Sequence, residues 1–243
     1  MLLRKEVIEV SSLKLIDLPL LVFYKLTDWF LQGICFLFFR IKITGREKVL
    51  NWKKKNKKTA FVAVARHRSL WDAVLMPVAF GGFQDTILNF VVKEEMRFLL
   101  SLMPFSDSYL TFIRRGKTKK ATIEKLINLL VEGNNIAIFP EGSTVPEYKE
   151  MNRGVLLIIK AAEQKLRKQI PIFPLNIKVV EGFYGEPKGK WRDYILGKVR
   201  IELRIGGPIY LEDLEKLIIK QNLPAKNKAE EMVKLLLEQV DKI

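Results

Sequence analysis

Short apolar runs alternate with helical patterns along most of this sequence, and this alternation restricts the fold more than any other feature. Residues 59–65 and 136–139 are β-branched or apolar enough to be buried strands, and residues 199–205 alternate as a half-buried strand does. Helical patterns fill intervals such as residues 93–103 and 118–131. The sequence therefore predicts an α/β fold with a mixed, largely parallel sheet flanked by helices.

The N-terminal region has a different pattern, rich in Leu, Phe, Tyr and Trp between Leu18 and Phe39. Its uncharged run is shorter than the roughly 20 apolar residues that span a bilayer, so helices lying in the membrane interface are expected. The inserting face would hold Trp29, Phe30 and residues 36–39, with Arg40 and Lys42 near lipid phosphates. A helix buried in the protein core is the alternative.

Two segments are therefore expected: apolar membrane-associating helices over residues 1–44 and an α/β domain over residues 45–243. The N-terminus shows no signal-peptide pattern. These features predict a peripheral or monotopic protein at the cytoplasmic face of the cell membrane.

The net charge of +15 indicates attraction to anions, namely nucleic acid, an anionic membrane surface or phosphorylated substrates. The aromatic residues cluster in the N-terminal segment and do not interleave with the basic runs, which argues against nucleic acid. One histidine and one cysteine exclude a Cys/His zinc site, and no metal is expected.

The single histidine, His67, lies five residues before Asp72. Histidine exchanges protons near neutral pH, and a carboxylate on its second ring nitrogen would fix its tautomer. A helix that begins at Ser69 and is interrupted at Pro77 would leave His67 in the preceding loop, from which it can fold back toward Asp72. The alternative is that Asp72 is only the acidic member of a capping box.

Chemically active residues follow three predicted strands directly. His67 follows residues 59–65, Arg114 and Arg115 follow residues 109–113, and Glu141 follows residues 136–139. Ligands of open α/β sheets bind outside the carboxyl ends of strands, so these residues are expected to converge on one cleft. A base, a guanidinium pair and a carboxylate suit a substrate with a phosphate and a reactive hydroxyl. The alternative for the arginines is a solvated helix start.

The sequence contains four ordered blocks: His67-x-x-x-x-Asp72, residues 112–115, Phe139-Pro-Glu-Gly-Ser143 and residues 170–174. In this order and at these intervals, the blocks resemble those of the glycerolipid acyltransferase family. Within the family, the chain is most similar to bacterial 1-acyl-sn-glycerol-3-phosphate acyltransferases. The sequence departs from the pattern at three places: Arg66 replaces a frequent asparagine, Arg114 a frequent acidic residue, and Ser143-Thr144 the usual Thr-Arg.

The resemblance implies a role for each matching residue. His67 would be the general base and Asp72 its orienting partner. The substrate-binding residues would be Arg115, Glu141, Gly142, Lys93, Arg114 and Arg153.

The resemblance also implies the reaction: transfer of a fatty acyl group from acyl-CoA or acyl carrier protein to the free hydroxyl of lysophosphatidic acid, without a further cofactor. Another lysolipid or glycerol 3-phosphate is the alternative acceptor. A serine hydrolase is disfavoured because the chain has no Gly-x-Ser-x-Gly elbow. A non-catalytic peripheral membrane protein that binds anions would explain the charge but not the residues at three strand ends.

Overall fold

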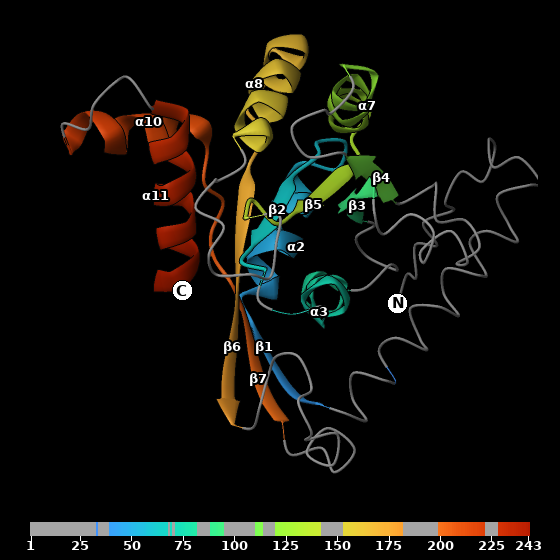
Figure 1. Cartoon of the computed structure of the whole chain (residues 1–243), viewed down its shortest axis with the longest axis vertical. Helices are drawn as coiled ribbons and strands as arrows, with labels where there is room; N and C mark the ends of the chain where they lie inside the picture. The colour runs from blue at the N-terminus through green and yellow to red at the C-terminus, as the bar shows by residue number, and fades with distance from the viewer. Residues whose placement is uncertain are drawn as a thin grey trace, which may run out of the picture.

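A computed structural model of the chain describes residues 33, 39–67, 69, 71–81, 88–94, 110–113, 120–141, 153–181, 199–221 and 228–243. The strands are β1 (Phe39–Thr44), β2 (Val62–Ala65), β3 (Leu88–Lys93), β4 (Leu110–Ile113), β5 (Asn135–Ile138), β6 (Ile172–Glu181) and β7 (Val199–Ile205). The helices are α2 (Arg46–Lys55), α3 (Trp71–Phe80), α7 (Lys120–Val131), α8 (Gly154–Leu166), α10 (Leu211–Lys220) and α11 (Lys228–Lys242). Figure 1 labels these elements.

The described strands form one seven-stranded sheet in the order β1-β7-β6-β2-β5-β3-β4. Of their pairings, β6 with β7 is antiparallel, and the other five are parallel. The predicted mixed, largely parallel sheet is thus confirmed. β7 lies one strand in from the edge, which β1 forms.

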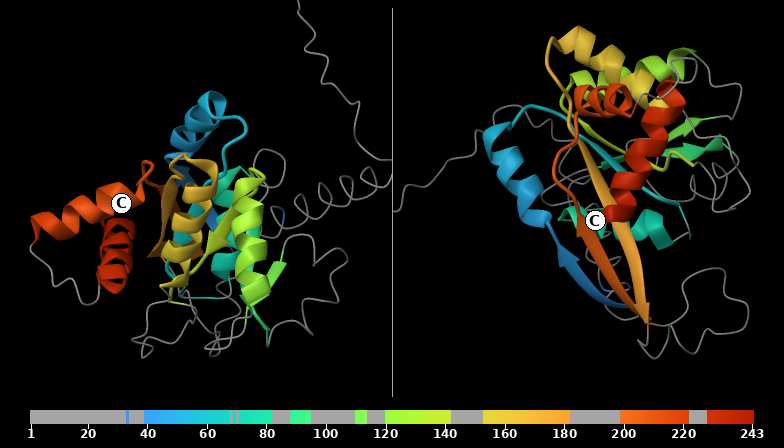
Figure 2. Two further views of the ribbon diagram at one scale, coloured as in Figure 1. Left: turned by 90° about the horizontal axis from the view of Figure 1, so that it is seen from above. Right: turned by 90° about the vertical axis from the view of Figure 1, so that its left-hand side faces the viewer.

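Helices cover both faces of this sheet (Figures 1 and 2). Val62 and Val64 of β2 belong to the core that α7, α8, α10 and α11 cover. Ala63 and Ala65 belong to the core on the other face, where α2 and α3 lie. Burial on both faces explains why β2 consists only of Val and Ala. The chain leaves the sheet after Ala65, where the polar residues Arg66 and His67 follow.

The N-terminal interpretation needs a correction at β1. Phe39–Thr44 pair in parallel with β7, although residues 1–44 were predicted as membrane-associating helices. Phe39 is 1% exposed and its ring lies edge-on to Trp71 at 4.9 Å, so its assignment to a membrane-inserting face is wrong. The rest of that predicted face lies outside the described residues. None of the helices in the described ranges is long and apolar enough to cross a membrane.

One helix was not predicted, and two helix predictions need correction. Residues 46–55 form α2, which has Val49 as its one buried residue and therefore lacks a strong apolar stripe. Lys93 ends β3 and pairs with Ile113, so the helix predicted from Lys93 cannot include that residue; Glu94 is in 3₁₀ conformation, and residues 95–103 lie outside the described residues. α3 continues through Pro77 to Phe80.

Gly45 joins β1 to α2 in a conformation that favours glycine. Its φ is +83°, and a Cβ atom would lie 2.0 Å from the backbone oxygen of Ile205. Gly45→Ala therefore combines a left-handed backbone with a backbone clash, and we expect it to lower the free energy of unfolding by at least about 1 kcal/mol. Urea denaturation would measure the loss, with Gly207→Ala as control because no atom lies within 4 Å of its Cβ position. Equal stabilities of the two variants would contradict this account.

Candidate active site

The site begins where two neighbouring strands end. β2 and β5 run parallel with Val64 opposite Ile138, so the segments after them leave the sheet side by side. Parallel strands end at the same edge of a sheet, which brings Arg66 and His67 next to Phe139 and Glu141. The predicted convergence of His67 and Glu141 is confirmed.

His67 and Asp72 form the expected pair. The imidazole Nδ1 lies 3.3 Å from Asp72 Oδ2, and the side chains are 19% and 1% exposed. The distance is long for a hydrogen bond, as is common for catalytic contacts without substrate. A proton on Nδ1 that is directed at Asp72 leaves the lone pair on Nε2, which is the nitrogen then able to accept a proton.

Asp72 also holds the start of α3. The backbone N–H of Ser69 donates to Asp72 Oδ2 at 2.7 Å, and the N–H of Trp71 donates to Ser69 Oγ at 3.3 Å. These contacts form a capping arrangement at the N-terminus of α3, where the helix dipole favours a negative charge. One carboxylate oxygen of Asp72 therefore contacts both the helix start and the imidazole, so the two interpretations do not exclude each other, and the catalytic role of Asp72 stays a prediction.

Phe139 fixes the plane of the imidazole. Its ring stacks on His67 with 4.5 Å between centroids and 20° between planes. Phe139 directly follows β5, so the position of β5 in the sheet determines where the Phe139 ring contacts His67. The imidazole is therefore oriented by a carboxylate at one nitrogen and an aromatic face beside it.

Glu141 binds the backbone of the histidine loop. Its Oε2 accepts the His67 N–H at 2.9 Å, and its Oε1 accepts Arg66 Nη1 at 2.5 Å. The resemblance implies a substrate-binding role for Glu141, which stays a prediction, and the structure shows that Glu141 connects the loop after β5 to the loop after β2.

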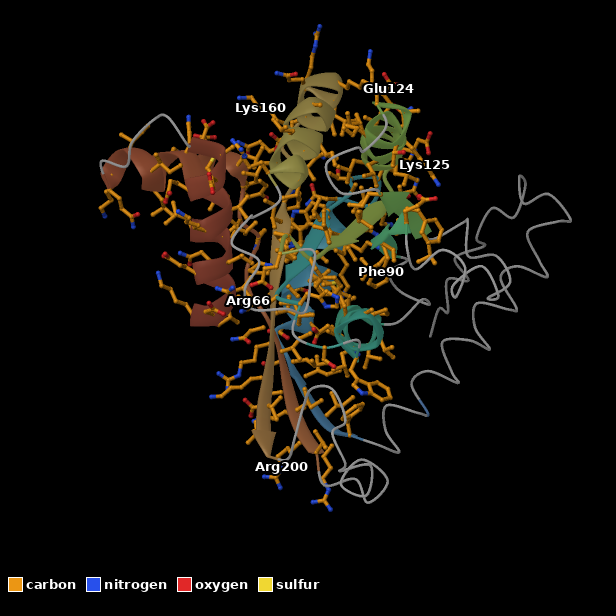
Figure 3. All side chains as sticks on the ribbon, in the orientation of Figure 1. Arg66, Phe90, Glu124, Lys125, Lys160 and Arg200 are labelled. Carbon is orange, nitrogen blue, oxygen red and sulfur yellow. The ribbon has the colours of Figure 1, made fainter. Side chains whose placement is uncertain are left out.

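Arg66 connects this site to the C-terminal helix. Its Nε donates to Asp241 Oδ1 at 2.8 Å and its Nη2 to Asp241 Oδ2 at 2.6 Å. The hydrogen bond to Asp241 is the largest of the interactions that raise the pKa of the Arg66 guanidinium, and the bond to Glu141 adds to it. Figure 3 shows Arg66 between α11 and the central strands.

Comparison with known proteins identifies the family. A model of the acyltransferase family matches residues 40–178, more than half of the chain. The chain belongs to the acyltransferase family. The acyltransferase match runs from within β1 to within β6 and so includes His67, Asp72 and Glu141.

Two curated acyltransferases are similar in sequence. The chain is 23% identical over 205 residues to "1-acyl-sn-glycerol-3-phosphate acyltransferase" of Bacillus subtilis (strain 168), covering 84% of this chain and 94% of the relative. It is 27% identical over 150 residues to "Probable 1-acyl-sn-glycerol-3-phosphate acyltransferase" of Mycoplasma pneumoniae, covering 60% of this chain and 52% of that relative. The match to the second relative thus spans about half of its length.

The other predicted site residues of this acyltransferase are less well defined by the structure. Lys93 ends β3, which is parallel to β5 and so ends at the same edge. Arg153 is exposed at the N-cap of α8, where it makes no side-chain capping bond. Arg114, Arg115 and Gly142 lie outside the described residues, and the roles of all five stay predictions.

Sequence reasoning missed Phe139 as an imidazole partner, and Arg66 and Asp241 as neighbours of the site. Arg66 was noted only as a departure from the family pattern. For Phe139 the available clue was its place directly after a strand, next to the predicted carboxylate. Nothing local in the sequence marks Asp241, which lies 175 residues from Arg66.

Proposed function

We propose that this acyltransferase moves a fatty acyl group from an acyl thioester to the free hydroxyl of lysophosphatidic acid, which gives phosphatidic acid for phospholipid biosynthesis. The His67–Asp72 pair carries the proposal, because a paired imidazole at a strand end suits deprotonation of a hydroxyl. The names of both curated relatives support this choice of acceptor.

The proposed reaction uses His67 as a general base. Nε2 takes the hydroxyl proton as the oxygen attacks the thioester carbonyl. The tetrahedral intermediate then expels the thiolate, and the imidazolium returns the proton to the departing sulfur. Asp72 stabilises the imidazolium in between. The thioester is already activated, so proximity and oxyanion stabilisation supply most of the rate, without a further cofactor.

Substrate binding is assigned to residues around this pair. Arg115 and Arg114, which follow β4, would hold the acceptor phosphate through charge-assisted hydrogen bonds. Lys93 would lie near the acyl carbonyl, with Gly142 in the loop of Glu141 and Arg153 at the start of α8. The donor would be acyl-CoA or acyl carrier protein.

The test is acyl transfer from a labelled thioester, offered as acyl-CoA and as acyl carrier protein in parallel. Lysophosphatidic acid, lysophosphatidylcholine and glycerol 3-phosphate would serve as acceptors. We expect lysophosphatidic acid to give the highest kcat/KM. A higher value with either of the others would replace the acceptor, and no transfer to any acceptor would favour a non-catalytic membrane protein that binds anions.

We place the protein on the cytoplasmic face of the cell membrane, in peripheral or monotopic contact with anionic lipid. The support is a basic face on the outer strands. Arg40 of β1 and Arg200 of β7 are exposed and opposite each other in register, and Lys42 follows two residues along β1. Arg200 also lies opposite Glu181 of β6, and Lys42 pairs with Glu202 at 3.6 Å, so acidic residues balance part of this charge. The exposed basic side chains would attract anionic headgroups.

Charge reversal at this face tests the membrane contact. Arg40→Glu with Arg200→Glu is expected to weaken binding to phosphatidylglycerol vesicles at least about 10-fold, since each basic residue near an anionic surface contributes about 1 kcal/mol. The matched control is Lys125→Glu with Lys160→Glu, which makes the same charge change at the end of the molecule opposite Arg200 (Figure 3). Vesicle pelleting would measure both; equal losses would contradict a localised contact.

A further inference from the structure

A continuous set of polar contacts joins the C-terminal helix to His67. Asp241 of α11 binds Arg66, Arg66 binds Glu141, and Glu141 accepts the backbone N–H of His67. These residues come from three segments that are far apart in sequence. Each contact is 3.0 Å or shorter, so the order of the four residues in space is well defined.

Arg66 is held as a fork. Its Nε and Nη2 engage the two oxygens of Asp241, and its Nη1 remains for Glu141. A guanidinium is planar and rigid, so the two hydrogen bonds from Nε and Nη2 to Asp241 fix the direction of Nη1. A lysine at this position would present one ammonium group and could not reproduce this geometry.

The end of α11 is itself anchored to the sheet. Arg204 Nη1 donates to the backbone oxygen of Ile243 at 3.2 Å, and Asn176 Nδ2 donates to that of Asp241 at 3.5 Å. α11 also buries six side chains in the core: Met232, Val233, Leu235, Leu236, Leu237 and Val240. These contacts hold the backbone of Asp241 in place, so its carboxylate can orient Arg66.

Glu141 links the orientation of the Arg66 guanidinium to the backbone of His67. One of its carboxylate oxygens is bound by Arg66 and the other by the His67 N–H. Rotation of the carboxylate would break the backbone contact and move the histidine loop. The imidazole must at the same time keep Asp72 at Nδ1 and Phe139 against its face, so a small loop displacement would misalign it.

We propose that Arg66 and Asp241 are positioning residues for acyl transfer, which hold Glu141 on the His67 backbone and thereby set the direction of the imidazole. This proposal rests on the proposed function, in which His67 is the base. It assigns a role to a residue outside the family match and to the arginine that departs from the family pattern.

The Arg66–Asp241 ion pair is partly exposed to water, which helps to distinguish a positioning role from a purely structural one. The Arg66 and Asp241 side chains are 26% and 42% exposed. Ion pairs this accessible to water contribute little to stability, so removing one should change the melting temperature little. Misplacement of a reacting group has a much larger effect on rate than on stability.

The experiment compares Asp241→Asn with Glu238→Gln. Both replace a carboxylate by its amide on α11, but Glu238 pairs with Lys242 at 3.9 Å and is 54% exposed. We expect Asp241→Asn to lower kcat about 10- to 100-fold with little change in the acceptor KM, and Glu238→Gln to match the parent. Assays would be run well below the melting temperature of each variant.

A second readout does not depend on activity. His67 is the one histidine of the chain, so a single imidazole Cε1–H resonance in ¹³C-histidine NMR spectra reports it without assignment. We expect Asp241→Asn and Arg66→Asn to shift this resonance from its parent position. Arg66→Lys should give a smaller shift than Arg66→Asn, and Glu238→Gln should give none. A parent-like kcat together with a parent-like resonance in Asp241→Asn would overturn the proposal.

The two readouts also separate this proposal from the proposed function. Absence of acyl transfer by the parent protein would reject the function, while the histidine resonance would still show whether Asp241 orients His67. A fall in melting temperature with unchanged kcat and resonance would assign Arg66 and Asp241 a structural role only, and would reject positioning.

Discussion

Replacing His67 with glutamine is expected to lower kcat for acyl transfer by about 10²- to 10⁴-fold, the usual contribution of a general base. Glutamine is similar in size but cannot take up a proton near neutral pH. The backbone N–H of residue 67 is kept, so the contact with Glu141 can persist in the variant. Initial rates at saturating acceptor and donor would measure the effect.

The control for His67→Gln is the folded state of the variant. Circular dichroism should match that of the parent, and the melting temperature measures what the lost contacts with Phe139 and Asp72 cost, so that rates are compared at a temperature where both proteins are folded. Diethyl pyrocarbonate offers an independent check, because His67 is the one histidine that it can modify. Full activity of His67→Gln would reject the mechanism.

Replacing Asp72 with asparagine is expected to have the second largest effect, a loss in kcat of about 10²-fold or more. Asparagine keeps an oxygen that can accept from Ser69 and from the imidazole, but it removes the negative charge that stabilises the imidazolium. The carboxylate is almost fully buried, at 1% side-chain exposure, so water cannot replace that charge. The pH dependence of kcat would be recorded for the parent and the variant.

Ser69→Ala separates the two roles of Asp72. This variant removes the hydroxyl that accepts the Trp71 N–H but keeps the Ser69 backbone N–H that binds Asp72. It should lower the free energy of unfolding by about 1 kcal/mol, as loss of an N-cap side chain does, and leave kcat near that of the parent. Parent-like activity in Asp72→Asn would reduce Asp72 to a capping residue.

The centre of the site could be predicted because it depends on local rules. A buried strand ends at Ala65, a cap at Ser69 starts a helix, and the five-residue spacing then turns His67 back toward Asp72. Glu141 follows from the same logic, since the strand before it is parallel to β2 and ends at the same edge.

Two fold elements escaped prediction for different reasons. α2 has one buried residue, so tertiary contacts and not an apolar stripe define it; Arg46, for example, donates to the backbone oxygens of Val78 and Ala79 in α3. In β1, Phe39, Ile41 and Ile43 alternate with polar residues as in a half-buried strand, but the preceding aromatic segment led to a helix prediction; the pairing of Phe39 with Val199 is long-range. Such long-range pairing is not written in either segment alone.

The contact of Arg66 with Asp241 escaped prediction for the same reason, and it has a consequence for protein synthesis. The two residues are separated by 175 positions. At about 5–20 residues per second, the ribosome needs roughly 10 to 35 s to reach Asp241 after it has made Arg66. Over the last 100 residues of that interval, from Glu141 to Asp241, the nascent chain contains His67, Asp72 and Glu141 but not the aspartate that binds Arg66. The complete arrangement therefore forms only after α11 has been translated.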